Sequence, residues 1–132
     1  HMRSIKELQK EIYENAKAKG FYEDPFNIPE KLALIHSEVS EALEDFRVST
    51  YPNTGWAEGW YEHSGVDKLP TSEKEDVSGK LNKPIGFASE LADVVIRVLD
   101  LAGAIDVDMQ RAIEEKMAYN ATRSYRHGNK KC

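Results

Sequence analysis

The stretch Ile28–Arg47 reads IPEKLALIHSEVSEALEDFR and combines a helical apolar period with a signal for the helix start. Apolar side chains recur every three or four residues and form one stripe, made of Leu32, Ile35, Val39, Ala42, Leu43 and Phe46. Asn27 can cap the first turn, and Pro29 lies where a helix tolerates proline. The stretch therefore predicts an amphipathic helix.

Helical spacing of apolar residues recurs on both sides of this stretch. The additional predicted helices cover roughly Ser4–Lys19, Phe87–Ile105 and Asp106–Tyr125. Ser4 and Glu7 form a capping-box pattern, and Gly20 is placed to end the first helix. No segment alternates apolar and polar residues over a strand's length. We therefore expect an all-α, four-helix bundle-like fold in a single domain over residues 1–132.

A long insertion, residues 48–85, separates the second and third predicted helices. It contains both tryptophans and three of the five prolines, and connections between bundle helices usually take only about 2–8 residues. Ser72 and Glu75 could cap one short helical turn inside it. Its aromatic residues could stack on a nucleobase, although packing of the insertion is the favoured interpretation. These residues are Tyr51, Trp56, Trp60 and Tyr61.

Composition excludes several classes of protein. The net charge of −5 argues against a general nucleic-acid binder, and no apolar run approaches the roughly 20 residues of a membrane span. The one cysteine, Cys132, cannot form an internal disulfide, which favours a cytoplasmic setting. We interpret His1, which precedes Met2, as a cloning remnant.

Two acidic pairs stand beside the apolar stripes. Glu38 and Glu41 belong to the second predicted helix, Glu90 and Asp93 to the third, and each pair has i, i+3 spacing on one helix face. Two carboxylates about 5 Å apart repel by roughly 3 kcal/mol at an effective dielectric near 20, so a cluster of four needs a cation. Oxygen ligands suit Mg²⁺ or Mn²⁺. The alternative is that each pair lies on a solvated helix face.

The fourth predicted helix carries a polar stripe at spacings of four, three and four residues: Lys116, Asn120, Arg123 and His127. Cationic side chains facing a metal–carboxylate site would neutralise a metal-chelated polyphosphate. The alternative is an ordinary basic helix end that complements the helix dipole. Taken by itself, the stripe favours this alternative.

Three separate strings resemble the MazG-like all-α nucleoside triphosphate pyrophosphohydrolases. They are residues 31–44 (KLALIHSEVSEALE), residues 86–100 (GFASELADVVIRVLD) and residues 115–128 (EKMAYNATRSYRHG). The resemblance implies Mg²⁺-dependent cleavage of a nucleoside triphosphate between its α- and β-phosphates, by dimers or dimers of dimers. The ExxE…ExxD pattern is that family's signature, although the 48 residues between Glu41 and Glu90 exceed the usual gap.

The resemblance also assigns expected roles to residues. The metal ligands would be Glu38, Glu41, Glu90 and Asp93. The phosphate-binding residues would be Lys116, Asn120 and Arg123. The expected catalytic residues are Glu41, Glu38 and Lys116, with Glu41 as the base toward the attacking water.

We therefore expect a Mg²⁺-dependent (or Mn²⁺-dependent) pyrophosphohydrolase of nucleoside or deoxynucleoside triphosphates, active in nucleotide-pool sanitation. A homodimer or homotetramer is expected, without a membrane or stable nucleic-acid partner. One alternative is a phosphoribosyl-ATP pyrophosphohydrolase, which would use the same acidic residues. Another is a non-catalytic helical module that binds a nucleotide or a partner through the insertion.

Overall fold

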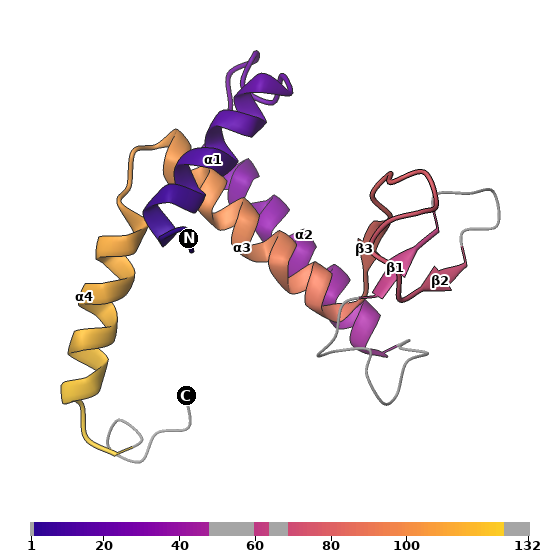
Figure 1. The fold of residues 1–132 in the computed structure, drawn as a ribbon. Coiled ribbons are helices and arrows are strands. Elements are labelled where there is room, and N and C mark those ends of the chain that lie inside the picture. Colours follow the sequence, from indigo (N-terminus) through magenta and orange to yellow (C-terminus); the bar gives the residue numbers. More distant parts are fainter. Residues whose placement is uncertain (1, 48–59, 64–68, 126–132) are drawn as a thin grey trace. The chain divides into compact units, whose positions relative to one another are not determined.

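The computed structural model describes residues 2–47, 60–63 and 69–125, and its described part is mostly helical (Figure 1). The elements in chain order are α1 (Ile5–Ala18), α2 (Ile28–Arg47), β1 (Trp60–Glu62), β2 (Pro70–Thr71), β3 (Lys83–Ile85), α3 (Phe87–Ala104) and α4 (Met109–Thr122). The chain forms two units, Phe26–Val98 and a second made of His1–Pro25 with Leu99–Cys132. Among the described helices, none has the length and apolar character needed to cross a membrane.

Local chemistry fixes the helix ends. The capping box at the start of α1 is confirmed, since the Ser4 side chain accepts a hydrogen bond from the backbone of Glu7 and the Glu7 side chain accepts one from Ser4. Asn27 caps α2, where its Oδ1 accepts a hydrogen bond from Glu30 N at 2.7 Å. After α1, Gly20 adopts φ +86°, a left-handed conformation that favours glycine. The predicted bounds of α1 and α2 are thus confirmed within about a residue.

Polar contacts join α1 to the start of α4 in the second unit. Gln9 Nε2 donates to Val107 O at 2.7 Å, and Lys6 N donates to Gln110 Oε1 at 2.9 Å. Gly103 of α3 packs against Tyr13 of α1 so closely that an added Cβ would lie 2.7 Å from Tyr13 Cβ. A larger residue at position 103 would therefore force Tyr13 or the backbone to shift.

In the unit Phe26–Val98, α2 and α3 run antiparallel. The Phe46 ring near the end of α2 lies 6.2 Å from the Phe87 ring at the start of α3. Farther along, Arg97 of α3 bonds Glu38 in the middle of α2. Since the contact moves back along α2 as it moves forward along α3, the two helices have opposite directions.

A small antiparallel sheet corrects the expectation of a fold without strands. Its order is β2-β1-β3, with Tyr61 opposite Thr71 on one side and Pro84 on the other. The short helical turn expected at Ser72 is also wrong, because an isolated bridge there pairs Glu75 with Leu81. The predominantly helical character is confirmed, and the strands were missed because two or three residues are too short to show a strand period.

Few apolar side chains are buried. Among the described residues the buried apolar ones are Ala42, Leu99 and Ala102. The predicted apolar stripes on α2 and α3 keep a partly open face, with exposed fractions between 46% and 54% at Leu32, Val39, Leu43, Phe46, Leu91 and Val95. Both helices carry an apolar stripe, but much of the apolar surface of these stripes stays exposed.

Candidate metal centre

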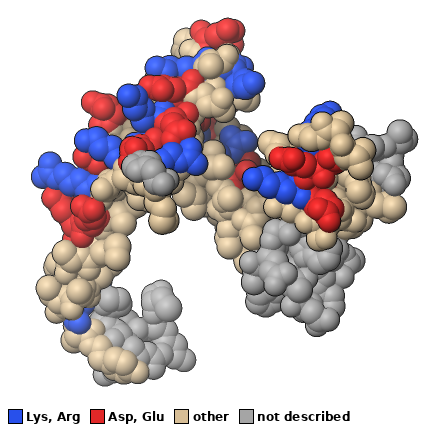
Figure 2. Space-filling model, viewed as in Figure 1, with Lys and Arg blue, Asp and Glu red and all other residues tan. Residues whose placement is uncertain are grey.

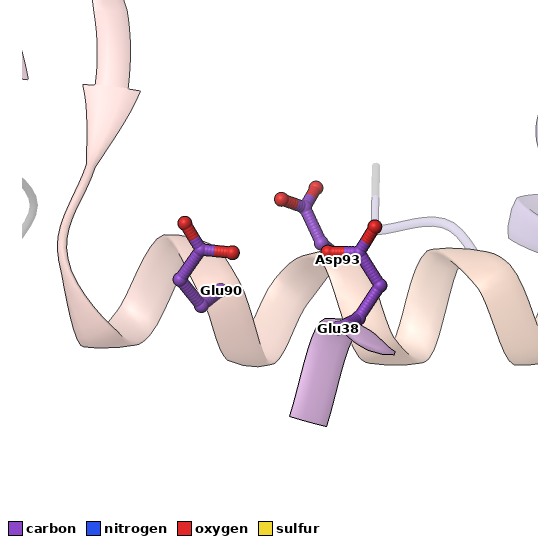
Figure 3. Close-up of side chains that lie close together, drawn as sticks. All are labelled: Glu38, Glu90 and Asp93. Carbon is purple, nitrogen blue, oxygen red and sulfur yellow. The ribbon is translucent and has the colours of Figure 1, made fainter. Parts of the chain in front are cut away.

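Three of the four predicted metal ligands come together. Glu38 of α2, Glu90 and Asp93 of α3 each offer a carboxylate oxygen, and these atoms all lie within 4.8 Å of one another. Figure 3 shows Glu90 and Asp93 on the same side of α3, where Glu38 reaches them from α2. The i, i+3 spacing on α3 and the antiparallel crossing of α2 thus produce the predicted acidic group.

Helix geometry explains why these positions meet. The turn before α3 ends at Gly86, whose φ is +97° and whose carbonyl accepts a hydrogen bond from Glu90 N at 3.0 Å. Glu90 therefore lies in the first turn of α3, next to the ring contact of Phe87 with α2. On α2, Glu38 is 8% exposed and lies one turn before the buried Ala42. Its position beside the apolar stripe brings a charged group to the helix interface.

Glu90 has the most perturbed carboxyl of the group. The pKa of its carboxyl is raised to about 7, first by burial and then by the charges of Asp45, Asp93, Glu41 and Glu38. Its Oε2 atom is buried and has no hydrogen-bond partner among the described residues. A buried oxygen without a partner in a field of negative charge is well suited to a cation.

Asp93 is perturbed in the same direction. Burial raises the pKa of its carboxyl, followed by the charge of Glu38, while the nearby cations Arg97 and Lys83 lower it. Both acids of α3 thus bind a proton more readily than an exposed carboxyl does. A divalent cation would compensate for the same repulsion.

Glu41 lies at the edge of the group. It is outside the set of three, and its side chain is exposed. A hydrogen bond with Glu38 raises the pKa of Glu41, and the charge of Glu38 raises it further. Glu41 therefore adjoins the other acids without being packed among them.

Arg97 forms the ion pair of the group. Its Nε donates to Glu38 Oε1 at 2.6 Å, and the Glu38 side chain is 11% exposed while that of Arg97 is 42% exposed. Charge-assisted hydrogen bonds of this kind are short and strong. The ion pair joins Arg97 Nε to Glu38 Oε1 and does not include the second carboxylate oxygen of Glu38.

The donor set fits a hard divalent cation. The ligand atoms are carboxylate oxygens from two helices, which suit Mg²⁺ or Mn²⁺. The raised pKa values of Glu90 and Asp93 come first from burial and then from the charges of nearby acids, and Glu90 also has a buried oxygen without a partner among the described residues. The fit therefore rests on the geometry of this chain.

No protein-family model, curated protein or solved structure matches the chain. The acidic group thus stands on its own distances and electrostatics. The MazG-like resemblance stays an interpretation of the three strings.

Two side chains near the group had no assigned role in the prediction. Asp45 follows Glu41 by four residues on α2, and its charge is the largest charge contribution to the raised pKa of Glu90. Lys83 of β3 lowers the pKa of Asp93 from within the predicted insertion. Helical spacing could have indicated Asp45, whereas Lys83 carries no sequence signal because its position depends on the sheet.

The predicted phosphate-binding stripe is only partly helical. Lys116 and Asn120 lie on exposed turns of α4, but the helix ends at Thr122, short of the predicted Tyr125. Arg123 is extended with ψ 152°, so it leaves the helix face of the other two. The end is tightened by Arg123 N, which donates to Asn120 O.

The environment of this stripe is mixed. The Arg123 guanidinium lies 6.0 Å from the centre of the Tyr119 ring, and Lys116 lines an apolar groove of about 410 Å³ on α4 with Met109, Ala112, Ile113 and Met117.

Lys116, Asn120 and Arg123 belong to a different unit from the acidic group. His127, Tyr51 and Trp56 lie outside the described residues. Figure 2 shows acidic and basic side chains interspersed over α1.

Proposed function

We propose that the chain is a Mg²⁺-dependent pyrophosphohydrolase of nucleoside or deoxynucleoside triphosphates. The observation that carries the proposal is the group of Glu38, Glu90 and Asp93, whose ligand oxygens lie within 4.8 Å and include a side chain with a partnerless buried oxygen. When bound, Mg²⁺ would supply charge neutralisation and orientation of the phosphate oxygens. The resemblance of the three strings to MazG-like enzymes selects the reaction.

Glu41 is the proposed base. Its carboxyl is exposed to solvent, and the pKa is raised by the adjoining Glu38, which moves it toward the working range of a general base. It would accept the proton of a water molecule that attacks the α-phosphorus. Glu38, Glu90 and Asp93 would hold the metal. Metal binding would thus use the less exposed carboxylates, and proton transfer would use the exposed carboxylate of Glu41.

The cationic residues complete the proposal. Lys116 and Arg123 would neutralise the phosphates, and Asn120 would donate a hydrogen bond to a phosphate oxygen. A cytoplasmic setting, where triphosphates are formed and consumed, is proposed with it.

Release of pyrophosphate tests the function. The wild-type chain is incubated with Mg²⁺ and a panel of triphosphates that includes phosphoribosyl-ATP, the substrate of the alternative activity. We expect pyrophosphate from at least one member, and loss of about 100-fold or more in kcat with Glu41→Gln or Asp93→Asn. Glu115→Gln is the matched control, because the Glu115 side chain is 66% exposed on α4. Folded wild-type protein that hydrolyses none of the panel would refute the proposal.

Self-association is the second part of the proposal. The half-exposed apolar residues of α2 and α3 form faces that a second copy of the chain could bury in a homodimer or homotetramer. Light scattering should give a mass of at least two chains. A monomer at micromolar concentration would contradict this part and leave the hydrolysis test unaffected.

A further inference from the structure

We propose that Arg97 is a built-in counter-cation that competes with free divalent ions for Glu38. It would make the acidic group bind a bare ion weakly and favour an ion that arrives with the nucleotide. The inference rests on the proposed metal role of the acidic group. Arg97 lies outside the ExxE…ExxD pattern, and its effect on the affinity for a divalent ion can be measured without substrate.

The geometry of the ion pair is the first support. Arg97 Nε lies 2.6 Å from Glu38 Oε1, and the Glu38 side chain is only 11% exposed. A carboxylate that is largely removed from water requires a charged partner or a proton. Arg97 supplies that partner from the same helix as Glu90 and Asp93, one turn beyond Asp93.

The charge balance around the pair is the second support. Five acids act on one another in this region: Glu38, Glu41, Asp45, Glu90 and Asp93. Two cations, Arg97 and Lys83, act on Asp93. Of these two, Arg97 makes an ion pair with a described residue. Of the two cations, Arg97 is therefore the one that an ion pair joins to the acidic group in the described part of the chain.

The positive charge of the Arg97 guanidinium also repels a divalent ion. Arg97 always carries its charge, so an ion bound to Glu38, Glu90 and Asp93 must enter next to a positive group. The phosphates of a bound nucleotide offset that repulsion, because they add negative charge on the open side of the ion. The Arg97 side chain is 42% exposed, so the guanidinium can turn toward solvent when the ion replaces it.

Binding of Mn²⁺ alone tests the inference. Free Mn²⁺ is measured by electron paramagnetic resonance during titration of wild type, Arg97→Met and Arg97→Lys at moderate salt and without nucleotide. We expect Arg97→Met to bind Mn²⁺ about tenfold more tightly than wild type, since a single charge near a divalent ion accounts for about that factor. Arg97→Lys keeps the charge and should stay within about threefold of wild type.

Arg111→Met is the matched control. It removes an arginine that also forms an ion pair with a glutamate, but the Arg111–Glu115 pair is an exposed i, i+4 pair on α4. Its Mn²⁺ affinity should equal that of wild type. Circular dichroism checks that each variant is folded, and Arg97→Gln replaces Arg97→Met if the latter is not.

Three results would overturn the inference: equal or weaker Mn²⁺ binding in the neutral Arg97 variant, equal tightening in Arg97→Lys, or equal tightening in Arg111→Met. A role in packing alone would not tighten ion binding. The pyrophosphate assay is independent of this titration. If the wild type hydrolyses triphosphate but Arg97→Met does not change the Mn²⁺ affinity, the role of Arg97 is refuted and the proposed function stands. If Arg97→Met tightens Mn²⁺ binding but the wild type hydrolyses no triphosphate, the proposed function is refuted and the effect of Arg97 on the ion stands.

Discussion

Replacement of Glu90 by glutamine is expected to stabilise the metal-free protein near neutral pH. In the folded chain, burial and the surrounding acids raise the pKa of Glu90 from the ordinary value of 4.5 to about 7. In the unfolded chain the carboxyl ionises at its ordinary pKa. Glutamine has nearly the same shape and carries no charge, so it removes the repulsion that makes ionised Glu90 unfavourable.

Proton binding by Glu90 determines whether stability rises or falls with pH. Between about pH 4.5 and pH 7 the folded state holds a proton on Glu90 that the unfolded state has lost, so folding takes up a proton and stability falls as pH rises. The loss is complete above about pH 7 and absent below about pH 4.5. At about 1.36 kcal/mol for each unit of pKa, the upper limit is about 3 kcal/mol.

Urea unfolding followed by circular dichroism measures this effect, in the presence of a chelator, at several values between about pH 4.5 and pH 8. Glu90→Gln should equal wild type at the acidic end and exceed it by about 1–3 kcal/mol at the basic end. Glu115→Gln, which changes an exposed carboxylate, should follow the wild-type curve. A Glu90→Gln variant that is no more stable than wild type at about pH 8 would refute the electrostatic reasoning.

Three further predictions concern the scaffold, each measured by urea unfolding. Gly103→Ala should destabilise the fold by about 1–3 kcal/mol, because the new Cβ meets Tyr13 at 2.7 Å, and an unchanged midpoint would contradict that close approach. Tyr22→Phe should cost about 1 kcal/mol, because it removes the 2.8 Å hydrogen bond that Tyr22 donates to Asp100; no loss would show that this bond adds nothing. Asn27→Ala should cost about 1 kcal/mol by removing the α2 cap, whereas Asn27→Ser should restore most of it.

Local sequence chemistry predicted the helices well. The capping residues Ser4 and Asn27 and the terminator Gly20 act through bonds within a few residues, so their effect is visible in the sequence. The predicted end of α4 lies too far along the chain. The helix ends where the Thr122 hydroxyl donates a hydrogen bond to Tyr119 O and Arg123 becomes extended, and both features depend on the local backbone geometry. The sheet was missed because its strands are held by partners far apart in sequence.

The candidate site also has features that the sequence predicts and features that it does not. The i, i+3 spacing predicted that Glu90 and Asp93 would share a helix face, and the apolar stripe of α2 predicted that Glu38 and Glu41 would both reach them. Glu38 belongs to the group of three, and Glu41 does not. The sequence could not predict that Glu41 stays exposed or that Arg97 pairs with Glu38, because both depend on the rotation of one helix against the other. Lys83 joins through the sheet, which has no local signal.

We propose that the acidic group serves hydrolysis of a triphosphate at its α-phosphorus. Hydrolysis in oxygen-18 water with Mg²⁺, followed by phosphorus-31 NMR and mass spectrometry, tests this proposal. We expect pyrophosphate without label and a nucleoside monophosphate that carries one oxygen-18 atom. Formation of nucleoside diphosphate and phosphate, label in the pyrophosphate, or unchanged turnover in Asp93→Asn would contradict it.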